Sequence, residues 1–233
     1  MVDLRMLAKP AMWNACALTF VITTSFGMVV FLLPQLFGVA ADGYGFGASA
    51  TDIGLFLLPG AIAGAVSDSV GGVAARRLGP RGVVVVGAVV TAATMIGLAS
   101  LHSAEWQLAL AKVLTAFAAG VGTTALLAGT ATAIETKDIG IATSLLVVTR
   151  VIGVALGAQV AGAILDAGAD PVSGLPAESA FVTGFAVAGL VAALALLVVR
   201  VTRLRVTRLR VTRLRVTRLR VTKIRITKKG VQA

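Results

Sequence analysis

The sequence predicts an all-α integral membrane protein, and three observations lead to that class. The chain has 233 residues, of which 58% are hydrophobic and 13% are charged, and its mean hydropathy is +0.96. A soluble domain is nearer half apolar and a quarter charged. The apolar residues form continuous runs of membrane length rather than alternating, which argues against an outer-membrane barrel. Basic residues, finally, recur beside alternate runs.

Six apolar segments are long enough to span a bilayer core of about 30 Å. Because lipid satisfies no backbone polar group, we expect each segment to be a helix and the whole to be a six-helix bundle. The expected spans are Met12–Phe37, Asp52–Ala75, Gly82–Leu101, Trp106–Ile134, Ile139–Leu165 and Ala180–Val199.

The basic residues between these spans predict the orientation of the bundle. The second span ends in Arg76, Arg77 and Arg81, whereas the segments that follow the first, third and fifth spans contain no Lys or Arg. The remaining basic residues outside the spans are Arg5, Lys9, Lys137 and those of the C-terminal tail. Basic residues near a span stay in the cytoplasm. We therefore expect both termini to be cytoplasmic.

The net charge of +11 belongs to the C-terminal tail. Residues 200–233 contain 13 of the 21 Lys and Arg residues and no acid, which leaves a body of residues 1–199 with a net charge of −2. The tail repeats VTRLR, and a period of five matches neither a helix nor a strand. It is either a repeat expansion that only keeps the C-terminus inside, a segment that binds anionic lipid headgroups, or, least favoured, one that contacts nucleic acid without sequence specificity.

The residues present argue against an enzyme. The chain has one Cys and one His, so no thiol or imidazole cluster has metal-ligand spacing. It contains no phosphate-binding glycine loop, no nucleophile elbow and no pair of catalytic carboxylates. We expect no catalytic residue, metal or cofactor.

Arg150 is the most informative single residue, because it falls near the middle of the fifth span. A charge at that depth is costly and normally faces a bundle interior or an aqueous cavity. We expect Arg150, with Thr149 and Gln159 on the same helix, to line a path for substrate or protons. The alternatives are a structural pair with a carboxylate at a helix end, or a residue that only fixes packing.

Two further ionisable residues lie inside spans. Asp68 lies eight residues before Arg76, and a carboxyl that alternates between a buried environment and one near a cation could carry a proton. The alternative for Asp68 is a structural pair with Arg76 or with a neighbouring helix. We expect Lys112, in the outer half of the fourth span, to extend its ammonium outward to the membrane surface.

Small residues predict where helices approach each other closely. Gly60 and Gly64 lie four residues apart on the second span, and Gly153 and Gly157 have the same spacing on the fifth. This spacing places both glycines on one face of a helix, where a neighbouring backbone can approach.

Four stretches in order resemble the last six helices of a Major Facilitator Superfamily transporter, in particular the bacterial fourteen-helix drug:proton antiporters. They are VDLRMLAKPAMW, GLFLLPGAIAGAV with GGVAARRLGPRG, AKVLTAFAAGVGTTALLAG, and DIGIATSLLVVTRVIGVALGAQVAGAIL. The resemblance covers residues 1–199 and places Arg150, Gly153 and Gly157 on matching positions. It also implies a cytoplasmic turn motif, formed here by Arg76, Arg77, Gly79, Pro80 and Arg81. The chain departs from the family pattern at Arg76, where an acid is usual, and at Val151, where a Gln is common.

The resemblance implies half of a transporter in the cell membrane, in a bacterium the inner membrane. It implies proton-coupled efflux of small amphipathic compounds, with the N-terminal half missing and supplied by the same gene, a separate chain or self-association. The expected partners are the lipid bilayer, that second half, a small-molecule substrate and protons, without specific nucleic acid. The alternative is a membrane-embedded interaction or scaffold protein, or a nonfunctional truncated remnant, with a tail that binds lipid headgroups.

Overall fold

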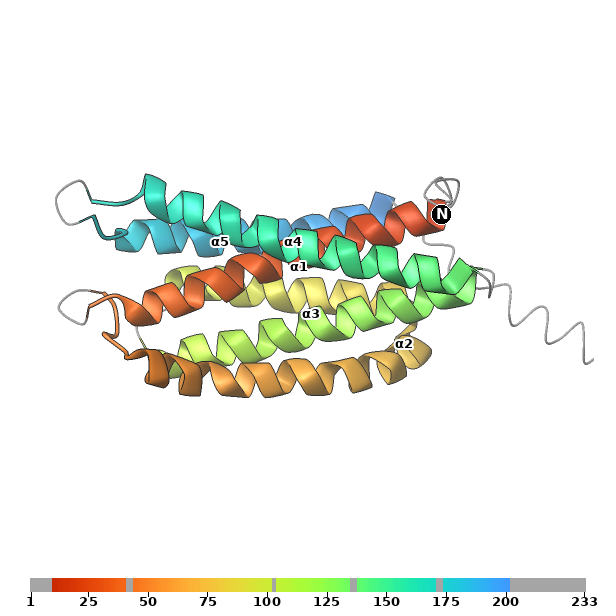
Figure 1. The fold of residues 1–233 in the computed structure, drawn as a ribbon, viewed down its shortest axis with the longest axis horizontal. Coiled ribbons are helices and arrows are strands. Elements are labelled where there is room, and N and C mark those ends of the chain that lie inside the picture. Colours follow the sequence, from red (N-terminus) through yellow and green to blue (C-terminus); the bar gives the residue numbers. More distant parts are fainter. Residues whose placement is uncertain (1–9, 41–43, 102–103, 135–137, 171–173, 202–233) are drawn as a thin grey trace, which may run out of the picture.

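The computed structural model of the protein describes residues 10–40, 44–101, 104–134, 138–170 and 174–201. Within these ranges, long helices lie side by side in one elongated bundle (Figure 1). They are α1 (Pro10–Gly38), α2 (Ala50–Ser100), α3 (Glu105–Ala133), α4 (Ile139–Ala167) and α5 (Glu178–Val201). The segment between α4 and α5 adds one isolated β-bridge, between Ala169 and Pro176.

The spans expected at Asp52–Ala75 and Gly82–Leu101 are both helical, but they are not separated by a loop: they are the two parts of α2, on either side of Gly79, and Leu101 caps the C-terminal end of α2. A straight helix of its 51 residues would extend for about 75 Å, more than twice the thickness of a bilayer core. The helix is not straight, because Gly79 has φ 74° and ψ 153°. Glycine is nearly the only residue that adopts this conformation, and the chain reverses there.

The reversal at Gly79 gives α2 two antiparallel arms, which are the orange and yellow ribbons of Figure 1. The order of contacts with α3 shows the two directions: Gly60 and Gly71 lie against Lys112 and Thr124, whereas Val84 and Leu98 cluster with Leu126 and Leu108. The first arm therefore runs parallel to α3 and the second arm runs antiparallel to it.

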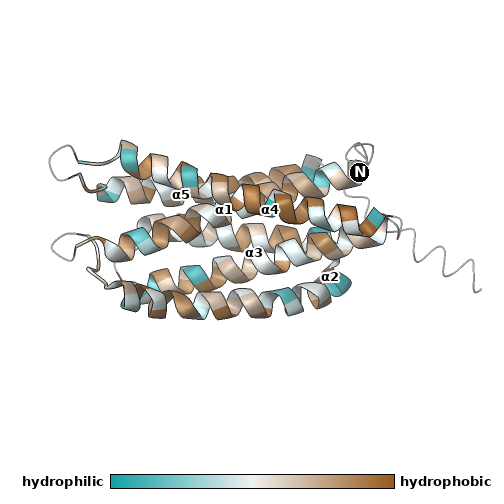
Figure 2. Cartoon of the chain, in the orientation of Figure 1, coloured by the Kyte–Doolittle hydropathy of each residue, from teal (hydrophilic) through white to brown (hydrophobic). Residues whose placement is uncertain are grey.

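The other four expected spans agree with α1, α3, α4 and α5 to within two residues at each end. All five helices of the described part are long and apolar enough to cross a membrane. Figure 2 shows the apolar residues along the middle of the helices and most of the hydrophilic ones near their ends. The N-terminal Arg5 and Lys9, the junction residue Lys137 and the repeat tail from 202 on lie outside the described residues.

The crossing of α1 and α4 depends on two glycines of α4, which have no side chain. A Cβ atom added at Gly157 of α4 would lie 2.9 Å from the carbonyl carbon of Thr24 and 3.0 Å from the amide nitrogen of Met28, both in the backbone of α1. At Gly153 it would collide with Thr23 and lie 3.0 Å from the carbonyl oxygen of Phe20. The backbones of α1 and α4 therefore approach more closely than any other residue type would allow.

At the end of the bundle opposite the α2 reversal, Tyr44 connects two junctions (Figure 1). Its hydroxyl donates a hydrogen bond to the carbonyl oxygen of Pro176, and its ring packs against Phe181 with a centroid distance of 5.8 Å. Tyr44 precedes α2 and Pro176 precedes α5, so one side chain links the α1–α2 and α4–α5 junctions. Burial, together with the negative charge of Glu178, raises the pKa of Tyr44.

Candidate functional site

A small cavity between α1, α3 and α4 is lined in part by polar side chains. It has a volume of about 50 Å³. Its lining residues are Thr19, Thr123, Thr124, Leu127, Leu146, Val147 and Arg150. A small-molecule pocket usually measures about 300–1,000 Å³, so this cavity holds water or one polar group of a larger ligand.

Arg150 supplies the positive charge of the cavity. It lies in the middle of α4, where the sequence places it, and its side chain lines the cavity. Within the described part of the chain it forms no ion pair, so the alternative of a structural pair with a carboxylate at a helix end is not seen there. An uncompensated charge inside a membrane protein is costly.

Asp68 reaches the same region from the first arm of α2. The hydroxyl of Thr124 donates a hydrogen bond of 2.9 Å to Oδ1 of Asp68, and Thr124 also lines the cavity with Arg150. One threonine thus joins the acid of α2 to the cavity that contains the base of α4. Asp68 is bonded to a neighbouring helix, and no ion pair with Arg76 occurs among the described residues.

Thr19 contributes a buried hydroxyl that has no partner among the described residues. Its side chain is 2% exposed, and its Oγ1 atom has no hydrogen-bond partner among the described residues. Thr123, in the same cavity, donates to the carbonyl oxygen of Ala119 at 2.9 Å. Buried hydroxyls normally have partners, so the Thr19 hydroxyl is an unsatisfied polar group on a residue that lines the cavity.

Lys112 corrects a prediction from the sequence. It was expected to extend outward, but its side chain is only 9% exposed, and its ammonium lies 5.2 Å from the centroid of the Phe26 ring. Its stem packs against Gly60, where a Cβ atom would lie 3.2 Å from that of Lys112. A cation over an aromatic face is stabilised by the ring quadrupole. The ammonium of Lys112 therefore stays inside the bundle, over the Phe26 ring of α1, and does not extend to the membrane surface.

Thr149 and Gln159, the other expected path residues, do not line the cavity. The hydroxyl of Thr149 donates to the carbonyl oxygen of Leu145 at 2.8 Å, within its own helix. Gln159 follows Arg150 by nine residues, which places it about 180° around the helix from Arg150. The structure therefore joins Arg150 with Asp68 through Thr124, and leaves Gln159 on another side of α4.

The expected cytoplasmic turn motif lies at the reversal of α2. Arg76, Arg77 and Arg81 are all exposed there. Arg76 donates from Nε to the carbonyl oxygen of Gly72 at 3.4 Å, so it is bonded within its own helix. Pro80 packs against α3, since a Cβ atom at Gly129 would lie 2.7 Å from its Cγ.

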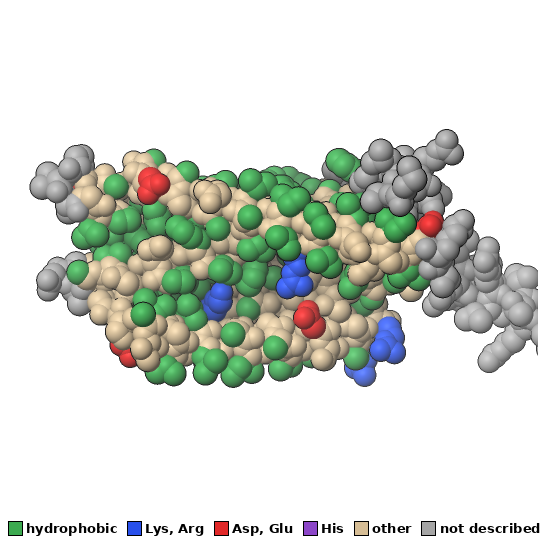
Figure 3. Space-filling view, viewed as in Figure 1, with side chains coloured by type: hydrophobic (Ala, Val, Ile, Leu, Met, Phe, Trp, Pro, Cys, Tyr) green, Lys and Arg blue, Asp and Glu red, His purple; other side chains and the backbone are tan. Residues whose placement is uncertain are grey.

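Figure 3 shows the outer face of the bundle, where basic and acidic side chains interrupt the apolar middle section.

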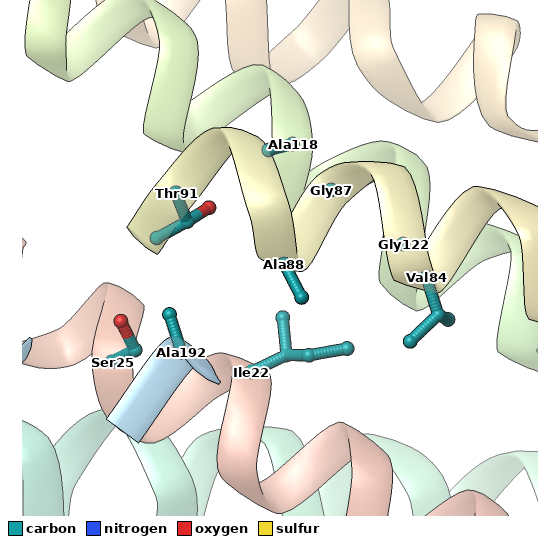
Figure 4. A pocket seen from close by; sticks show the side chains of 9 residues that line it. All are labelled: Ile22, Ser25, Val84, Gly87, Ala88, Thr91, Ala118, Gly122 and Ala192. Atoms are coloured by element: carbon teal, nitrogen blue, oxygen red, sulfur yellow. The ribbon is translucent and has the colours of Figure 1, made fainter. Parts of the chain in front are cut away.

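A second void, of about 10 Å³, lies inside the bundle (Figure 4). It is lined mostly by small and aliphatic side chains, and the Ser25 hydroxyl beside it already donates to the carbonyl oxygen of Ala188 at 2.8 Å. A space of this size holds about one water molecule.

The described residues contain no group of three acidic, His or Cys side chains that could hold a metal ion.

Comparison with known protein families gives the family of the chain. Residues 15–229 match the sequence profile of the Major Facilitator Superfamily. The chain belongs to the Major Facilitator Superfamily. Members of the superfamily are multi-pass membrane proteins that transport solutes and are not enzymes, so the prediction of a transporter rather than an enzyme is confirmed at that level. No curated protein matches the chain.

Proposed function

We propose that this superfamily member lines one side of a transmembrane path and exports small amphipathic compounds in exchange for protons. One observation carries the proposal: the hydrogen bond from Thr124 to Asp68 lies beside the cavity of Arg150. An acid and a base are thus held at one site in the middle of an apolar bundle. Ionisable residues at that depth in a membrane protein usually mark a substrate or proton pathway.

The cavity supports one side of a site rather than a complete one. At about 50 Å³ it is too small to enclose a substrate, and both Arg150 and Asp68 are exposed on the bundle surface. In this superfamily, two helical halves face each other and bind substrate between them near the bilayer midplane. We propose that a second bundle, from the same coding region, a separate chain or a second copy, covers this face.

Asp68 is the proposed proton carrier. Among the described residues it is the only acidic side chain away from the helix ends and junctions. As a carboxylate it accepts the bond from Thr124; once protonated it has a proton of its own to donate, and the bond to Thr124 changes. A path that opens alternately to the two sides of the membrane would expose Asp68 to two proton concentrations in turn.

The charges at the bundle ends support an orientation. Arg76, Arg77, Arg81 and Arg200 lie at the end where α2 reverses and α5 finishes, as Figure 1 places these elements. Asp52, Glu105 and Glu178 begin helices at the opposite end. By the positive-inside rule, we propose that the arginine end faces the cytoplasm of a bacterial plasma membrane.

The experiment is proton-driven dye accumulation in everted membrane vesicles from cells that express the chain. The variants are Arg150→Gln and Asp68→Asn, which remove one charge each; Asn keeps the shape of Asp, and Gln is a shorter polar side chain than Arg. Glu105→Gln is the matched control, because Glu105 is exposed in the first turn of α3. We expect the two site variants to lose accumulation by about tenfold or more, the effect of one charged hydrogen bond, and the control to retain it. Full activity of Arg150→Gln would contradict the proposal.

A further inference from the structure

We propose that the cavity between α1, α3 and α4 binds the carboxylate of an amphipathic organic acid. Arg150 supplies the charge and the Thr19 hydroxyl a hydrogen bond. This inference deepens the proposed function and rests on it, since it specifies the class of compound that the path accepts. The proposed substrate is an organic acid and not a cation or a neutral molecule.

The positive charge of Arg150 is unpaired among the described residues. Its guanidinium carries five N–H donors and no acceptor, yet it forms no ion pair in the part of the chain that the structure describes. Among the described residues Asp68 forms no ion pair with Arg150, and its Oδ1 accepts a hydrogen bond from Thr124. A bidentate carboxylate is the partner that matches the planar guanidinium best.

The hydroxyl of Thr19 is unbonded among the described residues. Other buried threonines of the bundle donate to the carbonyl oxygen four residues earlier, at 2.7–2.9 Å: Thr23, Thr115, Thr123 and Thr130. Thr19 makes no such bond although it is just as buried. Thr19 is one of the residues that line the cavity of Arg150. Because its buried hydroxyl has no bond within the bundle to give up, we expect it to turn toward a carboxylate bound there and donate to it.

The surroundings of the cavity contribute charge and shape. Away from the helix ends, the described residues contain two cations, Arg150 and Lys112, and one acid, Asp68, so the middle of the bundle has a net positive charge. Leu127, Leu146 and Val147 complete the cavity with apolar surface. A volume of about 50 Å³ accepts a carboxylate head, while the apolar body of the ligand lies outside, along the open face.

The test uses the full chain, purified into lipid nanodiscs, and three naphthalene probes of one shape. They are 1-naphthoate, the neutral 1-naphthamide and the cationic 1-naphthylmethylammonium, titrated by fluorescence against empty nanodiscs. We expect naphthoate to bind at least about tenfold more tightly than either of the others. We expect Arg150→Gln to abolish that preference, Arg150→Lys to keep part of it, and Thr19→Val to weaken naphthoate binding about threefold to tenfold.

Arg200→Gln is the matched control, because Arg200 is exposed in the last turn of α5 and does not line the cavity. Size exclusion and circular dichroism establish that each variant is folded. Equal binding of the three probes, or an Arg150-dependent preference for the cation, would overturn this inference and leave the proposed transport function intact. If a carboxylate side chain of a facing bundle occupies the cavity, naphthoate will not bind, and this result would also overturn the inference.

Discussion

The crossing of α1 and α4 makes a quantitative prediction for the substitution Gly157→Ala. The added Cβ would lie 2.9 Å and 3.0 Å from backbone atoms of Thr24 and Met28, whereas carbon atoms in contact prefer about 3.5–4.0 Å. Backbone atoms of a helix cannot rotate away as a flexible side chain can. The added Cβ would also collide with the carbonyl oxygen of Thr24. The two helices would therefore have to separate by about 1 Å or more, and overpacking of this kind costs about 1–3 kcal/mol.

Gly162→Ala on the same helix is the matched control. Its Cβ would lie 3.6 Å from Cζ of Phe31, an ordinary contact with a side chain. Both substitutions gain the same helix propensity, about 0.5–1 kcal/mol relative to glycine, so this gain cancels when the two variants are compared. Unfolding by SDS in mixed micelles, followed by far-UV circular dichroism, should show Gly157→Ala less stable than Gly162→Ala by about 1–3 kcal/mol. Equal stability of the two variants would refute this account of the crossing.

Three further predictions concern Lys112, Tyr44 and Gly79. Lys112→Met keeps the stem that packs on Gly60 and removes the charge over the Phe26 ring. The variant should fold, but dye accumulation in vesicles should fall by about tenfold, because ionisable residues at this depth usually belong to the transport path. Unchanged accumulation would exclude Lys112 from the path. Tyr44→Phe removes the bond to Pro176 and should lower the free energy of unfolding by about 1 kcal/mol at neutral pH. Because the pKa of Tyr44 is raised in the fold, its phenol should contribute stability below pH ~10 that is lost as the pH rises through the folded pKa; melting curves from pH 8 to 11 should show this loss in the parent and not in Tyr44→Phe. Gly79→Ala should cost about 1–3 kcal/mol through its φ of 74°, although nothing lies within 4 Å of the added Cβ; a stability equal to the parent's would show that the reversal tolerates another residue.

The sequence alone predicted the membrane class, the positions of the spans and the place of Arg150 in the middle of a helix. These features depend on composition and on the cost of burying polar groups. The sequence also placed a break at the arginine-rich turn, where Gly79 reverses α2. It predicted a helix on each side of this turn but not how short the break is, since one residue with positive φ interrupts the helical backbone without a loop.

The site was less predictable, because it depends on which helix faces are in contact. Lys112 could not be placed from its depth alone: Phe26 is 86 positions away in the chain and meets it only after α1 and α3 pack. Thr124 had no local signal, because its role comes from the register between the first arm of α2 and α3. Gln159 shares a helix with Arg150, but the nine-residue spacing separates them by about half a turn, which a helical-wheel argument could have found.

The central claim, that this face lines an aqueous path, is tested most directly by thiol accessibility. In a Cys16→Ala background, which has no other cysteine, the positions for single cysteines are Val147 and Ile152. Both are branched, apolar residues of α4 with similar exposure, 51% and 49%, but only Val147 lines the cavity. In intact membranes, a charged methanethiosulfonate reagent should react with Val147→Cys at least about tenfold faster than with Ile152→Cys, because the reactive thiolate forms in water and not in lipid. Equal rates, or a faster reaction of Ile152→Cys, would contradict the account.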